Sequence, residues 1–163
     1  MIDKNKAVID YLLTCPDIQG SPLYFNFIEA KDNSNQFITN ANDTIINQPY
    51  IDGSVEKVYT FTLIAFKSIS YNPVTQVEGY TDENVADMAD VQKLIDWVTS
   101  QNKIRNYPNF GGNCVVDNIK ANSNNPNLDS VDTTLTPALA KYSISIEIEY
   151  LDITDRLWNK EEE

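Results

Sequence analysis

The chain has 163 residues, 42% of them hydrophobic and 10% aromatic, which is the composition of a folded domain with its own core and excludes a disordered chain. Its 24 acidic and 12 basic residues give a formal net charge of −12, which excludes a protein that holds nucleic acid or anionic membranes by general positive charge. The N-terminal segment is charged where a secretory signal needs an apolar run, and no apolar run approaches the roughly 20 residues of a membrane span, so we expect a cytoplasmic protein without membrane contact.

The first two elements follow from the spacing of apolar residues. Residues 2–14 place apolar side chains one, three and four positions apart, with Asp3 early and Pro16 just beyond the end. This spacing predicts an amphipathic helix that packs on a sheet. Residues 17–21 are turn-like, and the alternation of apolar side chains in residues 22–28 then predicts a strand.

The segment 31–48 is rich in Asn, Asp, Ser and Thr. Its large apolar residues come in two pairs, Phe37-Ile38 and Ile45-Ile46, which are separated by a polar stretch. This composition is typical of a long loop rather than of a core, so it predicts a protruding arm or hairpin.

A long strand follows the turn signal Asp52-Gly53. From residue 58 the side chains alternate between two faces, with Tyr59, Phe61, Leu63 and Ala65 on one and Val58, Thr60, Thr62 and Ile64 on the other. Between residues 64 and 69 the alternation blurs, which indicates either a bulge or burial on both faces.

The second half contains one more helix and one short strand before the C-terminal region. An apolar stripe at helical spacing predicts a helix over residues 82–101, in which we expect Trp97 to pack in the core. Residues 114–119 are a plausible strand, whereas the Asn-rich residues 121–134 argue against regular structure.

The most regular pattern lies in residues 142–153, where isoleucine and tyrosine occupy every second position over most of the segment. We expect a central strand there, followed by an acidic tail over residues 154–163. The order of elements predicts a single α+β domain over residues 1–163, with a small, largely antiparallel sheet of about four strands. Two helices would pack on one face of that sheet, and residues 31–48 would extend from it as a polar arm.

The residues that most enzymes need are missing from the sequence. There is no histidine, so a histidine-activated nucleophile is excluded, and two cysteines are too few for a zinc site or a disulfide framework. We interpret Cys15 and Cys114 as buried free thiols. Two Ser-x-x-Lys matches and a partial calcium-loop pattern at residues 32–43 lack their companion residues, and no glycine-rich phosphate loop occurs. We therefore predict no catalytic residue, no metal and no cofactor.

Glu147 and Glu149 share one face of the predicted C-terminal strand. Paired carboxylates can hydrolyse glycosides, which leaves a carbohydrate enzyme open as a minor alternative. Without a recognisable pocket, a solvated face or the wet surface of an assembly is the better interpretation.

Four segments together carry a resemblance to a known family. They are YIDGS at 50–54, VYTF at 58–61, LIDWV at 94–98 with a following asparagine, and AKYSISI at 140–146. In this order they resemble the small "minor capsid" proteins of long-tailed bacteriophages, which belong with the tail terminators. The chain departs from that pattern in its longer Asn-rich stretches and in its acidic tail.

The resemblance implies a structural virion protein rather than an enzyme. Such a protein forms a hexameric ring on the head-proximal end of the tail tube, stops tube polymerisation and presents the surface that the filled head joins. The implied partners are further copies of the chain, the tail-tube protein and a head-completion or neck protein. DNA would pass through the lumen without specific binding, in a ring that carries roughly −72 charges before screening.

The candidate site residues form two groups. As subunit contacts we predict Phe37, Ile38, Ile45, Ile46, Tyr50, Asp52 and Gly53. As acidic residues that face the lumen we predict Glu147 and Glu149.

Two further classes remain open. Another neck adaptor protein or a tail-tube subunit would also assemble into rings but would contact different neighbours. A soluble acidic inhibitor that mimics DNA would stay small in solution and bind a nuclease.

Overall fold

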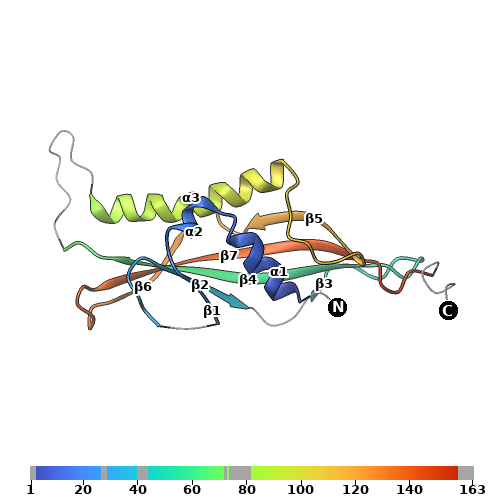
Figure 1. Cartoon of the computed structure of the whole chain (residues 1–163), viewed down its shortest axis with the longest axis horizontal. Helices are drawn as coiled ribbons and strands as arrows, with labels where there is room; N and C mark the ends of the chain where they lie inside the picture. The colour runs from blue at the N-terminus through green and yellow to red at the C-terminus, as the bar shows by residue number, and fades with distance from the viewer. Residues whose placement is uncertain (1–2, 27–28, 40–43, 72, 74–81, 158–163) are drawn as a thin grey trace.

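The computed structural model describes residues 3–26, 29–39, 44–71, 73 and 82–157. The described residues form an α+β structure with three helices and a mixed sheet of seven strands, which confirms the predicted class (Figure 1). The elements are α1 (Lys4–Leu12), α2 (Pro16–Gln19), β1 (Leu23–Phe25), β2 (Ser34–Thr39), β3 (Thr44–Ile45), β4 (Val55–Ser68), α3 (Glu83–Lys103), β5 (Cys114–Ala121), β6 (Asn127–Asp132) and β7 (Leu139–Asp152).

The centre of the sheet is the antiparallel pair β4 and β7, each 14 residues long. The two strands are in register along their whole length, from Val55 opposite Asp152 to Ser68 opposite Leu139. The alternation seen in the sequence of β7 gives one buried face, on which Ile144, Ile146, Ile148 and Tyr150 are at most 3% exposed. The prediction of a central C-terminal strand is therefore confirmed.

The strands beside this pair are interrupted, which explains why the sheet has seven strands and not about four. On one side β2 and then β3 pair with successive parts of β4, and on the other side β5 and then β6 pair with successive parts of β7. Only β1 and β2 pair in parallel, so the sheet is largely antiparallel as predicted. The prediction of irregular structure over residues 121–134 is wrong for β6, because that strand is mostly exposed and its side chains carry no alternating pattern.

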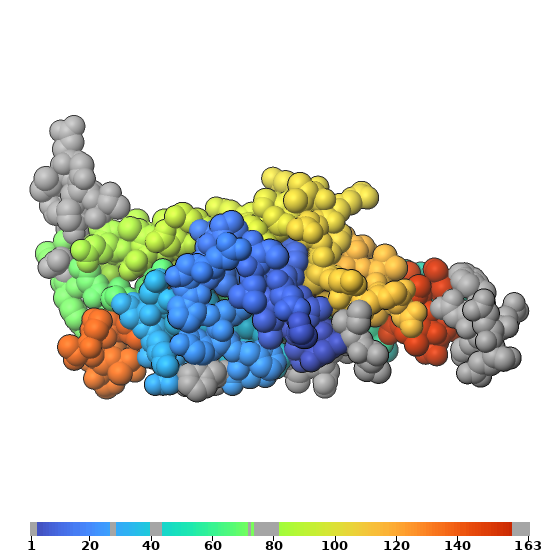
Figure 2. Space-filling view, in the orientation of Figure 1, coloured from blue at the N-terminus to red at the C-terminus, as the bar shows by residue number. Residues whose placement is uncertain are grey.

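All three helices cover the same face of the sheet. Their buried residues join the inward residues of β4 and β7 in one main core, and Figure 2 shows α1 and α2 in blue beside α3 in yellow-green. Trp97 of α3 packs against this core with its ring 5.0 Å from that of Tyr11, as predicted. Two predicted helices are confirmed, and the short α2, which Pro16 begins, is a third that the sequence pattern did not reveal.

The prediction of a protruding arm is wrong for β2. This strand lies between β1 and β4, and Phe37 is completely buried, with its ring 4.9 Å from that of Phe61. Local hydrogen bonds allow polar residues to be buried here: Ser34 Oγ donates to Lys31 O at 2.6 Å and Gln36 Nε2 to Glu29 O at 2.5 Å. The strand could not be predicted from the composition of residues 31–48, because buried polar side chains with hydrogen-bond partners do not give the apolar alternation by which strands are recognised.

The blurred alternation after Ile64 results from burial on both faces. Leu63 and Ala65 belong to the main core, whereas Ile64 and Phe66 form a second small cluster with Leu139 on the opposite face of the sheet. Of the two alternatives offered by the sequence, the described structure shows two-sided burial.

Side chains cap backbone groups of the edge strand β5. Asn102 Oδ1, at the end of α3, accepts a hydrogen bond from the backbone N–H of Ile119 at 3.2 Å. Tyr107 donates its hydroxyl proton to the carbonyl oxygen of Asp117 at 2.8 Å. Because an uncapped edge can pair with a strand of another chain, these contacts limit such pairing at β5.

Replacing Asn102 with leucine should lower the free energy of unfolding by about 1–3 kcal/mol, because the buried N–H of Ile119 loses its acceptor. Urea unfolding at neutral pH measures the change. The matched control is Lys103→Leu, which alters the adjacent, exposed helical position and should shift stability by no more than about 0.5 kcal/mol. Equal losses in both variants would contradict the cap.

Candidate functional site

The sheet face opposite the helices is here called the open face. Its central positions carry mostly polar residues from three neighbouring strands. Thr60, Glu147 and Lys120 form one row across β4, β7 and β5, and Val58, Glu149 and Asn118 form the next row. The open face therefore offers charged and hydroxyl groups rather than a hydrophobic surface at its centre.

Glu147 and Glu149 both lie on the open face, so their predicted common face is observed. Glu149 accepts hydrogen bonds from Lys120 Nζ at 2.7 Å and from Asn118 Nδ2 at 3.0 Å. These bonds, with that from Lys120 the stronger, lower the pKa of Glu149 below its ordinary value. Glu147 lies 3.5 Å from the same ammonium group and accepts from Asn122 Nδ2 at 3.0 Å.

The open face carries more negative than positive charge. Among the described residues, Lys120 alone forms ion pairs with the two glutamates. The pKa of the nearby Asp117 is raised by burial and, more weakly, by the charge of Glu149. The lowered pKa of Glu149 keeps this carboxylate ionised at neutral pH. This arrangement is suited to a charged surface.

A rigid turn connects β3 to β4. Its backbone closes through hydrogen bonds from Tyr50 N to Ser54 O and from Gly53 N to Tyr50 O, both of 2.9 Å. Asp52 Oδ1 accepts from the backbone N–H and from the hydroxyl of Ser54, and these bonds contribute most to the lowered pKa of Asp52. Gly53 has a φ of +86°, which confirms the turn expected from the Asp-Gly signal.

The turn is fixed to the C-terminal segment after β7. Arg156 Nε donates to Asp52 Oδ2 at 2.9 Å, and Leu157 N donates to Asp52 O at 2.9 Å. Sequence reasoning missed these two residues, because nothing in the sequence pairs positions that are 104 residues apart. Asp52 and Gly53, predicted as subunit contacts, shape and anchor the turn.

Large apolar side chains are exposed in this turn and in the segments that adjoin it, and the turn lies at the right-hand end of Figure 1. Ile51 is 99% exposed at the tip. Around it, the exposed fractions are 56% for Ile45, 47% for Ile46, 48% for Tyr50 and 59% for Leu157. We call these five residues the turn-end cluster. Three of them, Ile45, Ile46 and Tyr50, are among the predicted subunit contacts.

Two of the predicted apolar contact residues do not belong to this cluster. Phe37 is buried in the core and cannot contact a neighbouring subunit, so its assignment to an interface is wrong. Ile38 is half-buried and packs against the second small cluster on the open face. The physical reason in both cases is that β2 pairs with β4 instead of extending from the domain.

An ion pair joins the two central strands close to the turn. Lys57 Nζ lies 2.8 Å from Asp152 Oδ2, and the two side chains are 26% and 18% exposed. Burial alone would raise the pKa of Asp152, but hydrogen bonds from Lys57 and Thr154 outweigh it and lower the pKa from 3.8 to about 2. Because the pKa is lower in the folded state, the pair stabilises the protein above pH 4 and loses this effect as the pH falls toward 2.

The variant Lys57→Met should raise the pKa of Asp152 and remove up to about 2 kcal/mol of stability at neutral pH. Its unfolding free energy should therefore change less than that of the parent protein between pH 4 and pH 2. Urea unfolding at several pH values measures both effects. The control Lys6→Met breaks an exposed pair with Asp10 and should leave the pH dependence of stability unchanged. If the unfolding free energy of Lys57→Met changed with pH as much as that of the parent protein, the account of this ion pair would be contradicted.

The described residues offer no group of three or more His, Cys, Asp or Glu side chains that could hold a metal ion. Cys15 is buried in the main core, whereas Cys114 is only partly buried, and no disulfide joins the two. Within the same residues, no helix is both long and apolar enough to span a membrane. Comparison with known proteins found no family and no curated protein that matches the chain.

Proposed function

We propose that the chain is a structural protein that assembles into a closed ring of identical subunits. The observation that carries this proposal is the turn-end cluster, in which a rigid turn holds Ile51 almost fully exposed. An isolated exposed isoleucine is unremarkable, but exposed large apolar side chains both in an anchored turn and in the segments that pair beside it are typical of a surface that a partner covers. The hydrogen bonds from Arg156 and Leu157 hold the turn in place before any partner binds.

A ring of identical subunits needs one surface that fits a different surface on the next copy. The turn that carries Ile51 lies at one end of an elongated domain, so it can reach a neighbour without moving the core (Figure 1). Contact of this cluster with a different surface of the next copy would be head-to-tail, as a ring requires, rather than the self-complementary contact of a dimer.

Within this class, a bacteriophage tail terminator is the specific function that we propose. The order of the YIDGS turn, the following strand, the long helix and the late strand supports it, together with the α+β class. The ring would cap the head-proximal end of the tail tube, bind the tube protein on one side and join a head-completion or neck protein on the other. It would be assembled in the host cytoplasm and remain in the virion.

The open face is the candidate for the lumen of this ring. Glu147 and Glu149 are held on it by hydrogen bonds, and Lys120 compensates only part of their charge. With a net charge of −12 on each subunit, such a surface would repel the phosphates of passing DNA. The acidity thus supports passage of DNA rather than its binding.

Substituting Ile51 with serine tests the contact surface directly. Each subunit interface would lose about 1.5–3 kcal/mol of apolar burial, and a closed ring repeats this loss at every interface. We expect rings of the parent protein in negative-stain images and only single chains of Ile51→Ser at the same concentration. Circular dichroism should show the same fold for both.

The matched control is Ile104→Ser, because Ile104 is 69% exposed but lies at the end of α3, away from the turn-end cluster. This variant should form rings like the parent protein. Rings of Ile51→Ser would contradict the proposed contact. Long tubes of the parent protein would instead identify a tube subunit.

A further inference from the structure

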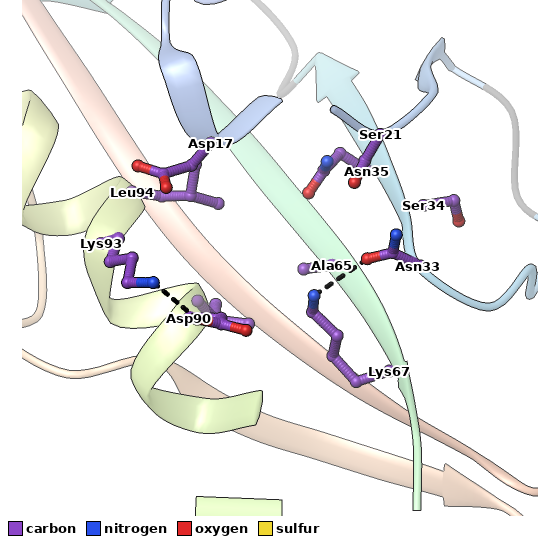
Figure 3. Close-up of a pocket in the computed structure, with 11 residues that line it drawn as sticks. Asp17, Ser21, Asn33, Ser34, Asn35, Ala65, Lys67, Asp90, Lys93 and Leu94 are labelled. Carbon is purple, nitrogen blue, oxygen red and sulfur yellow. Dashed lines mark hydrogen bonds and ion pairs between the residues drawn. The ribbon is translucent and has the colours of Figure 1, made fainter. Parts of the chain in front are cut away.

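A polar cavity lies on the helix-covered side of the sheet, where α2, β2, β4 and α3 meet (Figure 3). Its volume is about 240 Å³, which is room for several water molecules. The charged residues Asp17, Asp90 and Lys93 at its rim are exposed, whereas Asn35 and Ala65 are buried.

The wall of this cavity contains an amide side chain from the sheet. Asn35 of β2 is only 6% exposed, and its backbone N–H donates to Pro22 O at 2.8 Å. Its side chain lines the cavity and makes no hydrogen bond with the described part of the chain. The amide can therefore donate to, and accept from, a molecule in the cavity.

Lys67 of β4 places a positive charge beside this amide. Figure 3 shows its ammonium group extending toward the space between β2 and α3. It donates one hydrogen bond to the neutral Asn33 Oδ1 at 3.0 Å, and no carboxylate among the described residues forms an ion pair with it. An ammonium group has three donors, so Lys67 can donate further hydrogen bonds to an anionic group in the cavity.

The opposite wall carries charges of both signs. Asp90 of α3 accepts a hydrogen bond from Lys93 at 2.8 Å, and Asp17 of α2 lines the same space. The two lysines and two aspartates of the lining balance each other, so the cavity as a whole favours neither a simple anion nor a simple cation. A molecule with both charges can satisfy both walls.

We propose that this cavity binds a small zwitterion of the size of a free amino acid. The carboxylate of the ligand would accept hydrogen bonds from Lys67 Nζ and from the amide of Asn35, and its ammonium group would face Asp90. The inference rests on the cavity alone and does not depend on the proposed ring.

Titration of the isotope-labelled full chain with L-serine, followed by amide NMR shifts, tests the proposal. L-serine should give saturable shifts that centre on residues 33–35, 65–67 and 90–94. Acetate, which lacks the ammonium group, and glycinamide, which lacks the carboxylate, should each bind at least about tenfold more weakly. Absence of a saturable shift up to about 10 mM would show a cavity that holds water only, and would overturn the proposal.

The variant Lys67→Met should weaken L-serine binding at least about tenfold, since it removes the group that meets the carboxylate. The control Lys141→Met alters a lysine on the open face and should leave binding unchanged. The same spectra report whether each variant is folded, and Asn35→Ala provides a second test if Lys67→Met is not. Unchanged binding in a folded Lys67→Met or Asn35→Ala protein would contradict the site.

Discussion

Replacing Phe37 with alanine should lower the free energy of unfolding by about 3–5 kcal/mol. The residue is completely buried, and its ring lies 4.9 Å from that of Phe61 and 5.4 Å from that of Phe25. Truncation would leave a cavity between β1, β2 and β4, which the paired backbones prevent from collapsing. Urea unfolding of both proteins at neutral pH measures the difference.

The control for this variant is Ile45→Ala, in the same Asn-rich segment but 56% exposed. It should change the stability by no more than about 0.5 kcal/mol, because little surface is withdrawn from water at this position. A loss below about 1 kcal/mol for Phe37→Ala would mean that residues 34–39 do not form the strand described above.

Replacing Gly53 with alanine should distort the turn that presents Ile51. The φ of +86° is unfavourable for any residue with a Cβ atom, and an added Cβ would lie 2.4 Å from Asp155 O. The backbone must therefore shift, and the contacts of Asp52 with the C-terminal segment shift with it. We expect a loss of about 1–3 kcal/mol in unfolding free energy, measured in urea, and loss of rings in negative-stain images.

Gly112→Ala is the matched control, because a Cβ atom at this position meets nothing within 4 Å. It should leave stability within about 0.5 kcal/mol of the parent protein and should not affect assembly. If Gly53→Ala formed rings as readily as Gly112→Ala, the shape of the turn would have no part in the subunit contact.

The elements that the sequence predicts best are those in which burial is one-sided and the spacing is regular. β7 and α3 have this property, and their positions are confirmed within a few residues. β2 and β6 were missed for opposite reasons: β2 buries polar side chains such as Gln36 with local partners, and β6 is held by backbone pairing with hardly any burial. Neither situation leaves a periodic apolar pattern.

The candidate site could be predicted in part. The Asp52-Gly53 turn and the common face of Glu147 and Glu149 follow from local sequence rules, because turn geometry and strand alternation act over a few residues. The contact between Asp52 and Arg156 depends on the full register of β4 with β7, which no local rule supplies. No local rule predicts the cavity beside α3 either, because residues from four separate elements line it.

The central claim is that the chain forms a closed ring of identical subunits. The most direct test is the mass of the purified full chain in solution, measured by light scattering after size exclusion over a range of concentrations. Six chains of 18.5 kDa should give a particle of about 111 kDa, which appears as a ring in negative stain. A mass of one chain at every concentration up to about 100 µM would contradict the claim.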